Sequence, residues 1–153
     1  MTNESTCLAL REFMTAAVPY WETLGLELKE VGDGRAVFEA AVRPGHLQNG
    51  IVHGGVLASI ADSACAVAAV SKIFPANYAT TINLQVAYLK PVIAGRFTAE
   101  GRCVKAGKSI IFCEASIFDD RRALVCTASS QLIAIPRQTE SALKPVQNPA
   151  KKT

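Results

Sequence analysis

The chain has 153 residues, of which 50% are hydrophobic and 19% are charged, as expected for one globular domain with a buried core. Its formal net charge of +3 is too small to indicate nucleic-acid binding. The polar N-terminus predicts no signal peptide, and the longest apolar run, residues 56–70, is short for a membrane span and carries Asp62. We therefore expect a cytoplasmic protein that binds neither nucleic acid nor membrane.

The first third of the chain predicts one helix and two strands. Residues 6–18 have apolar positions at helical spacing, and Pro19 ends the run. Residues 26–30 and 35–43 are expected to pair as strands around a Gly-Asp-Gly turn. A loop is predicted for residues 44–50.

Residues 54–71 predict a helix that is apolar on nearly its whole circumference, which is typical of a buried helix. Its many alanines would let a sheet approach closely. Four strands are expected next, and their short connections predict an antiparallel meander: residues 80–89, 96–105, 109–118 and 123–135. The polar segment 137–153 predicts a disordered tail.

This order of elements predicts an α+β fold over residues 1–136, in which an antiparallel sheet wraps around one long central helix and an N-terminal helix precedes them. The exposed face or an edge strand of the sheet needs cover, so we expect a homo-oligomer. The cysteines are odd in number and lack C-x-x-C spacing, which predicts reduced core residues: Cys7, Cys65, Cys103, Cys113 and Cys126.

Asp62 is the only charged side chain between Gly54 and Ser71. A carboxylate on an otherwise apolar helix is costly unless it has hydrogen-bond partners or a function, so Asp62 is a candidate catalytic residue. The alternative is an aspartate that bonds a neighbouring hydroxyl, Ser59 or Ser63, or that reaches the surface.

The sequence His53-Gly54-Gly55 stands where the central helix is expected to begin. Glycines leave their backbone N–H groups approachable, and a helix start carries unpaired N–H donors and the positive end of the helix dipole. Such a turn suits a carbonyl oxygen that becomes an oxyanion. The alternative is a plain tight turn in which His53 supports the loop.

The spacing of these groups constrains how they act together. Asp62 lies eight residues after Gly54, which is about 12 Å along a helix axis. A carboxylate so far away cannot reach a carbonyl bound at the start of its own helix. If both groups serve one reaction, the site must form between two subunits.

The stretch HLQNGIVHGGVLASIADSACAVAA resembles the motif region of hotdog-fold thioesterases of the phenylacetic-acid-pathway type. That family places H-G-G at the start of the central helix and an aspartate nine residues after the histidine, as His53 and Asp62 are placed here. The later stretch TTINLQVAYLKPV resembles the next strand of the family, and Thr81, Tyr88 and Pro91 match its pattern.

The resemblance implies a role for each matching residue. Asp62 would activate water or attack the thioester carbonyl itself. The Gly54 N–H, with Gly55 adjacent, would polarise the carbonyl. Thr81 would hold the water or orient Asp62, and His53 would fix the glycine turn.

One position departs from the family pattern. The family often has Asn or Gln six residues before the H-G-G histidine, where this chain has Leu47. A loop of altered length would bring either Gln48 or Asn49 to the reacting centre, and the sequence does not decide between them.

The resemblance covers residues 20–135 and implies an acyl-CoA thioesterase that needs neither metal nor cofactor and forms a dimer or a dimer of dimers. The alternative is a non-catalytic acyl-CoA-binding or sensing protein on the same fold. Three lysines are candidates for binding CoA phosphates: Lys90, Lys105 and Lys108. The alternative is that these lysines lie in solvated loops without a ligand.

Overall fold

The structure is a computed structural model that describes residues 4–137. Two helices, α1 (Glu4–Ala17) and α2 (Tyr20–Leu24), precede the long helix α3 (Gly54–Ile73). The main sheet contains six strands: β1 (Leu26–Gly32), β2 (Arg35–Ala41), β5 (Asn77–Tyr88), β6 (Arg96–Ala106), β7 (Ile110–Asp119) and β8 (Leu124–Pro136). The short helix η1 (Pro44–His46) leads into a small sheet of β3 (Leu47–Gln48) and β4 (Ile51–Val52).

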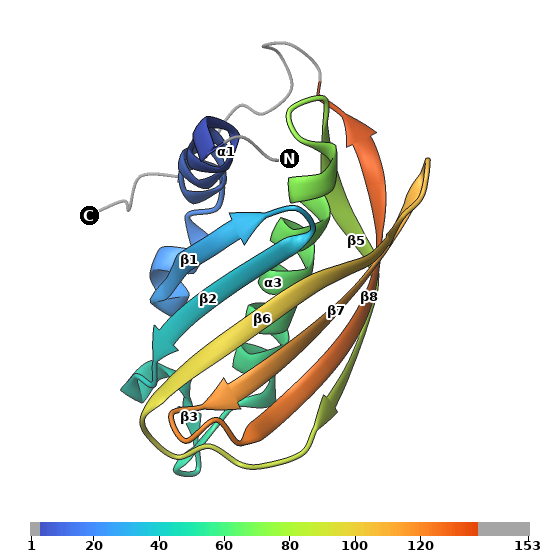
Figure 1. Cartoon of the computed structure of the whole chain (residues 1–153). Coiled ribbons are helices and arrows are strands. Elements are labelled where there is room, and N and C mark those ends of the chain that lie inside the picture. Colours follow the sequence, from blue (N-terminus) through green and yellow to red (C-terminus); the bar gives the residue numbers. More distant parts are fainter. Residues whose placement is uncertain (1–3, 138–153) are drawn as a thin grey trace, which may run out of the picture.

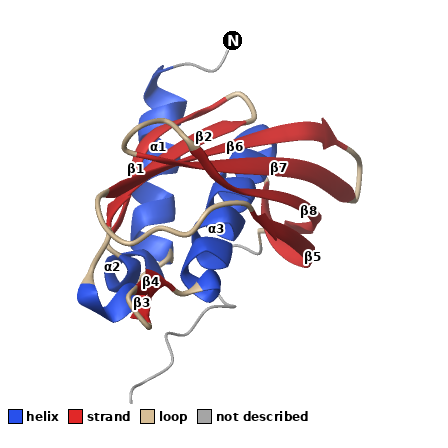
Figure 2. Ribbon diagram, turned by 90° about the horizontal axis from the view of Figure 1, so that it is seen from below, coloured by secondary structure: helices blue, strands red, loops and turns tan. Residues whose placement is uncertain are grey.

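The main sheet is antiparallel and curves around α3 (Figure 1). Figure 2 shows α1 beside β1, and α2 close to the end of α3 that begins at Gly54. The predicted α+β fold, with a sheet wrapped around a long central helix and an N-terminal helix, is therefore confirmed. The sequence did not predict α2, a single short turn of helix that Gly25 ends with a left-handed conformation at φ 63°.

The strand order is β1-β2-β6-β7-β8-β5. The predicted meander is wrong at its first connection, because β5 pairs with β8 and not with β6. Both sides of β6 are already occupied, by β2 and β7. The chain after β5 instead runs across one end of the sheet to reach β6 (Figure 1), and β5 becomes an edge strand.

Small residues allow α3 to lie very close to β6. A Cβ atom added to Gly101 would overlap the carbonyl oxygen of Ala64. Ala64 itself is fully buried, as are its helix neighbours Ile60 and Cys65. The alanine-rich helix therefore packs against a glycine in the sheet, as its composition predicted.

The cysteines are all free thiols, and three of them, Cys65, Cys113 and Cys126, are buried. Burial raises the pKa of Cys65 to about 12 and that of Cys126 to about 11, so both remain protonated near neutral pH. Cys7 and Cys103 are only partly buried, so the prediction of core residues is confirmed for three of the five.

Helix α3 is the one helix among residues 4–137 that is long and apolar enough to cross a membrane. However, 56% of its most apolar stretch is buried inside the fold, as expected for the core helix of a folded domain.

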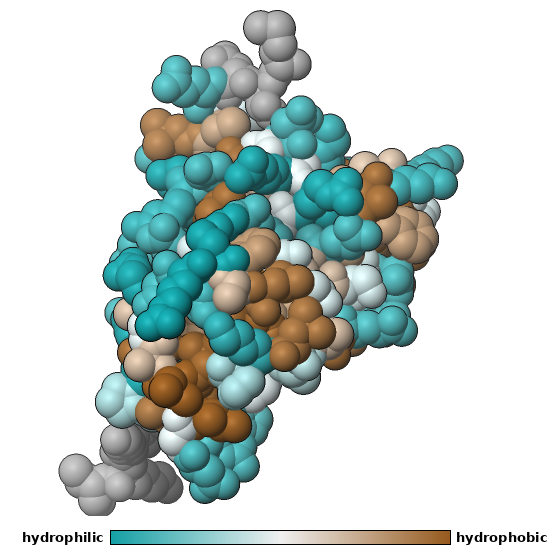
Figure 3. Space-filling model, turned by 60° about the horizontal axis from the view of Figure 1, so that its bottom comes forward, coloured by the Kyte–Doolittle hydropathy of each residue, from teal (hydrophilic) through white to brown (hydrophobic). Residues whose placement is uncertain are grey.

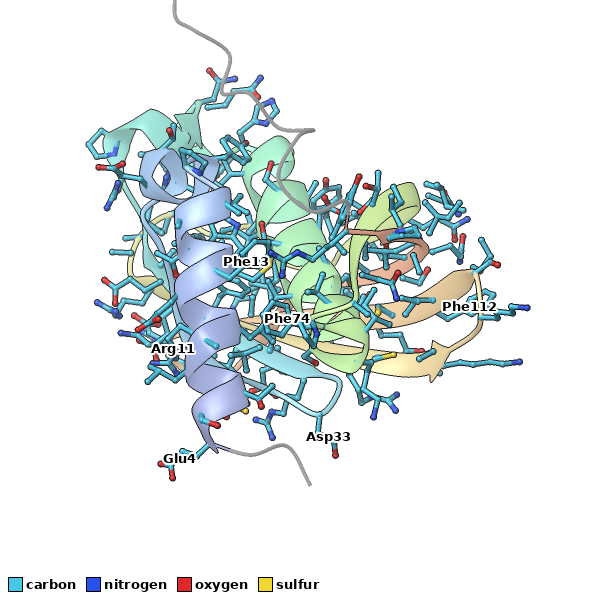
Figure 4. All side chains as sticks on the ribbon, turned by 90° about the horizontal axis from the view of Figure 1, so that it is seen from above. Glu4, Arg11, Phe13, Asp33, Phe74 and Phe112 are labelled. Carbon is cyan, nitrogen blue, oxygen red and sulfur yellow. The ribbon has the colours of Figure 1, made fainter. Side chains whose placement is uncertain are left out.

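The rings of Phe13 on α1 and Phe74 after α3 lie 5.7 Å apart between centroids (Figure 4). The guanidinium of Arg137 lies 4.3 Å from the Phe13 ring centroid, so this residue packs on the domain. The rest of the predicted tail, residues 138–153, lies outside the described part of the chain.

Candidate active site

Helix α3 begins at a turn in which one of the two glycine backbone N–H groups is hydrogen-bonded and the other is not. His53 is the N-cap, and its Nδ1 accepts a hydrogen bond of 2.8 Å from the Gly55 N–H. The Gly54 N–H donates no hydrogen bond within residues 4–137. His53 therefore caps the helix through its side chain, and Gly54 rather than Gly55 keeps an unpaired donor at the positive end of the helix dipole.

Tyr88, at the end of β5, packs directly on this turn. Its hydroxyl donates a hydrogen bond of 2.9 Å to the Gly54 carbonyl oxygen. A Cβ atom on residue 54 would lie 3.2 Å from Cζ of the Tyr88 ring, which is tighter than ordinary van der Waals contact. A larger residue than glycine at position 54 would thus displace either Tyr88 or the turn.

Asp62 is half-buried on α3, and Thr81 on β5 donates a hydrogen bond of 2.8 Å to its Oδ1. Its Oδ2 accepts no hydrogen bond from the described residues. Thr81 therefore fixes one carboxylate oxygen, and the second remains available to a water molecule or a substrate atom.

The neighbouring serines, which were the alternative partners for Asp62, bond elsewhere. Ser59 Oγ donates 2.8 Å to the Gly55 carbonyl oxygen and lies 3.0 Å from the Tyr20 hydroxyl. Ser63 Oγ donates 2.8 Å to the Ser59 carbonyl oxygen and accepts 3.1 Å from the indole N–H of Trp21. Both hydroxyls hold α2 against α3, so Thr81 is the only residue among residues 4–137 that donates a hydrogen bond to the Asp62 carboxylate.

Gly54 and Asp62 lie on one continuous helix, so about 12 Å of axial rise separates them within a chain. The edge strand β5 supplies a contact at each position, through Tyr88 and through Thr81. Side chains along and just after this strand are exposed although they are apolar or aromatic, among them Ile82 at 57% and Leu89 at 57%. Figure 3 shows apolar side chains gathered on the lower face of the molecule.

Residues 47–52 form a β-hairpin and not the predicted loop. Asn49 and Gly50 both have positive φ, 52° and 79°, as a two-residue hairpin turn requires. The signal was the Asn-Gly pair between the apolar residues Leu47 and Ile51. The exposed side chains of Gln48 and Asn49 make no hydrogen bond within residues 4–137, so the choice between them stays open.

The three candidate lysines are not brought together in one chain. Lys90 forms an ion pair of 2.8 Å with Asp119, and this pair lowers the pKa of the Asp119 carboxyl. Lys105 and Lys108 are exposed near the β6–β7 turn. Ile110, just after that turn, pairs with Ile133 on β8, and Ile133 pairs with Thr80 near the start of β5. Lys90 follows the other end of β5, so the turn lies far from it along the strand.

Among residues 4–137, no three His, Cys, Asp or Glu side chains are arranged to hold a metal ion.

The thioesterase-superfamily sequence profile matches residues 49–126, which include the glycine turn, Asp62 and Thr81. The chain belongs to the thioesterase superfamily. The predictions of a thioester hydrolase and of the hotdog fold are confirmed at this level.

Curated relatives of this thioesterase carry related names. A 1,4-dihydroxy-2-naphthoyl-CoA hydrolase from Listeria monocytogenes is 31% identical over 69% of this chain and 86% of its own length. A medium/long-chain acyl-CoA thioesterase from Salmonella typhimurium is 25% identical over 85% of this chain and 94% of its own.

Solved structures share the fold. A mutant of a phenylacetic acid degradation protein from Thermus thermophilus has a TM-score of 0.69 at 29% identity, over 75% of this chain and 97% of that one. A thioesterase from Haemophilus influenzae has a TM-score of 0.76 at 21% identity, over 82% of this chain and 90% of that one.

The contact between Tyr88 and the glycine turn was not predicted. Tyr88 matches the family pattern, but the resemblance implied no role for it. Its hydrogen bond to Gly54 joins residues 34 positions apart. The only sequence signal for this contact was the aromatic residue at the strand end, which does not reveal its partner.

Proposed function

We propose that this thioesterase hydrolyses acyl-CoA thioesters to the free acid and CoA, at sites formed between two subunits. The observation that carries the proposal is the Asp62 carboxylate, which Thr81 holds by one oxygen on the half-buried side of an otherwise apolar helix. The names of the Listeria and Salmonella relatives support a CoA thioester as substrate.

The two groups would share the chemistry. The unpaired Gly54 N–H would donate to the thioester oxygen and stabilise the negative charge that develops on it. Asp62 would remove a proton from the water that attacks the carbonyl carbon and return it to the CoA thiolate as the carbon–sulfur bond breaks. Alternatively Asp62 would attack the carbon directly and expel the CoA thiolate, which takes a proton from water, and a water molecule would then hydrolyse the resulting anhydride.

A two-fold dimer would place both groups at one reacting carbonyl. Edge strand β5 spans 12 residues and carries exposed apolar side chains, so its pairing with β5 of a second copy would satisfy unpaired backbone groups and bury apolar surface. The glycine turn of one chain would then face Asp62 of the other. Lys105 and Lys108, exposed and without an ion pair among the described residues, remain candidates for binding CoA phosphates.

The test is turnover of short, medium, long and aromatic acyl-CoAs by the wild type and by Asp62→Asn, which keeps the shape of the side chain without its charge. We expect kcat to fall roughly 10²–10⁴-fold for every hydrolysed substrate. A Thr81→Val variant should lose less, and Thr81→Ser, which keeps the hydroxyl, should recover most of that loss. Wild-type turnover by Asp62→Asn would exclude the catalytic role.

Single-turnover hydrolysis in ¹⁸O-water tests the direct attack. An ¹⁸O atom in the enzyme carboxylate would show that an anhydride formed and that water opened it at the Asp62 carbon, because activation of water labels only the released acid. Tight acyl-CoA binding without hydrolysis of any tested thioester would instead identify a binding protein.

A further inference from the structure

His46 is buried, with 5% of its surface exposed, although it lies in a surface turn between β2 and the β3–β4 hairpin. Its Nδ1 accepts a hydrogen bond of 3.1 Å from the Arg43 backbone N–H. An accepting Nδ1 places the ring proton on Nε2. Nε2 has no hydrogen-bond partner, and His46 is the only described residue with such a buried, unpartnered side-chain atom.

The backbone of His46 connects this ring to the start of α3. The His46 carbonyl oxygen accepts a hydrogen bond of 2.8 Å from the His53 N–H, and the His46 N–H donates 2.9 Å to the Arg43 carbonyl oxygen. His53 in turn caps α3 and is bonded covalently to Gly54. The position of the Gly54 N–H therefore depends, through two hydrogen bonds and one peptide bond, on the turn that the His46 ring holds closed.

We infer that His46 is a positioning residue for the Gly54 N–H, and that only its neutral ring holds the oxyanion donor in place. A proton on Nδ1 would point at the Arg43 N–H, so that two donors would face each other and the turn would open. The inference rests on the proposed function, in which Gly54 is the oxyanion donor.

The charges around the ring favour its neutral form. Burial lowers the pKa of His46, the Arg43 guanidinium lowers it further, and the Leu24 carbonyl partly offsets both. On α2, the Glu22 backbone carbonyl accepts from the Arg43 guanidinium, and before α3 the His53 backbone N–H donates to the His46 carbonyl oxygen. No carboxylate is among the groups that shift the His46 pKa, so only the Leu24 backbone among them favours the imidazolium ion.

Two substitutions separate positioning from simple loop support. His46→Asn keeps an acceptor, Oδ1, where Nδ1 stands, but cannot be protonated. His46→Leu fills similar space without an acceptor. Gly45→Ala is the matched control, because a Cβ atom there meets no heavy atom within 4 Å.

At pH 8 we expect His46→Leu to lower kcat about 10–100-fold with little change in KM, because a displaced oxyanion donor affects the transition state more than the bound substrate. His46→Asn should restore most of kcat. In the wild type kcat should fall on acidification as His46 is protonated, at a lower pH than an ordinary histidine because burial lowers the His46 pKa, and His46→Asn should lose that part of the fall. The chain has 2 histidines, so NMR of the variant assigns both ring titrations directly.

The Gly54 amide resonance provides a measurement that needs no turnover. It should shift with the His46 titration in the wild type and stay constant over that pH range in His46→Asn. Equal kcat losses in the Asn and Leu variants, or an unchanged acid limb in His46→Asn, would overturn the inference. If the Gly54 resonance follows His46 but no thioester is hydrolysed, the proposed function fails and the coupling stands. If hydrolysis is normal but the Gly54 resonance does not shift as His46 titrates, the inference alone fails.

Discussion

Complementation between two inactive chains tests the intersubunit site. One chain carries Asp62→Asn. The other carries Gly54→Val, whose added side chain meets the Tyr88 ring, since a Cβ atom alone would lie 3.2 Å from its Cζ. Each homodimer lacks one essential group at both sites and should be inactive. In a heterodimer, one site combines the intact glycine turn of the first chain with the intact Asp62 of the second, and the other site has neither.

The expected magnitude follows from the geometry. About 12 Å of helix separates Gly54 from Asp62 in one chain, whereas a reacting carbonyl needs both within about 3 Å. Random mixing makes half of the dimers mixed, and each mixed dimer has one good site of two. Activity should therefore return to about a quarter of the wild-type level, or to about half for heterodimers purified through two different tags, if sites act independently.

The assay is steady-state release of CoA, with mass spectrometry to prove subunit exchange and circular dichroism to prove that both variants fold. The control pairs Asp62→Asn with Gly45→Ala, a substitution that should leave its own homodimer active. No recovery of activity in verified, folded heterodimers would refute the intersubunit site, because the two groups would then act within one chain or one of them would be misassigned.

Three further outcomes are expected. Gly101→Ala should destabilise the fold by about 1–3 kcal/mol in urea unfolding, because its Cβ atom overlaps the Ala64 carbonyl oxygen, whereas Gly45→Ala should be near neutral. Folding lowers the pKa of His46 from 6.5, so the folded chain binds that proton less tightly than the unfolded chain does. The free energy of unfolding should therefore decrease on acidification below about pH 6.5, less steeply in His46→Asn. Hydrolysis should survive EDTA, and a loss that added divalent ions reverse would show that a metal takes part.

The central helix, and the distance that it places between Gly54 and Asp62, are predictable from the sequence alone. An apolar run with glycines at its start and one carboxylate predicts where α3 begins, that it lies in the core and that Gly54 cannot meet Asp62 within one chain. These features depend on residues close together in the chain, so helical periodicity encodes them. The hairpin at Asn49-Gly50 was encoded in the same local way, and the error there was an unrecognised turn signal.

Only the tertiary structure decided which groups are partners. Thr81 was matched to a role by resemblance, but three contacts depend on the tertiary fold: its hydrogen bond to Asp62, the hydrogen bond from the Gly55 N–H to His53, and the ion pair of Lys90. The pairing of β5 with β8 was likewise unreadable, because short connections favour neighbouring strands and only closure of the sheet around α3 overrides that preference. The burial of His46 has the same origin: a polar residue in a surface turn becomes a core group only when α2 and the start of α3 pack around it.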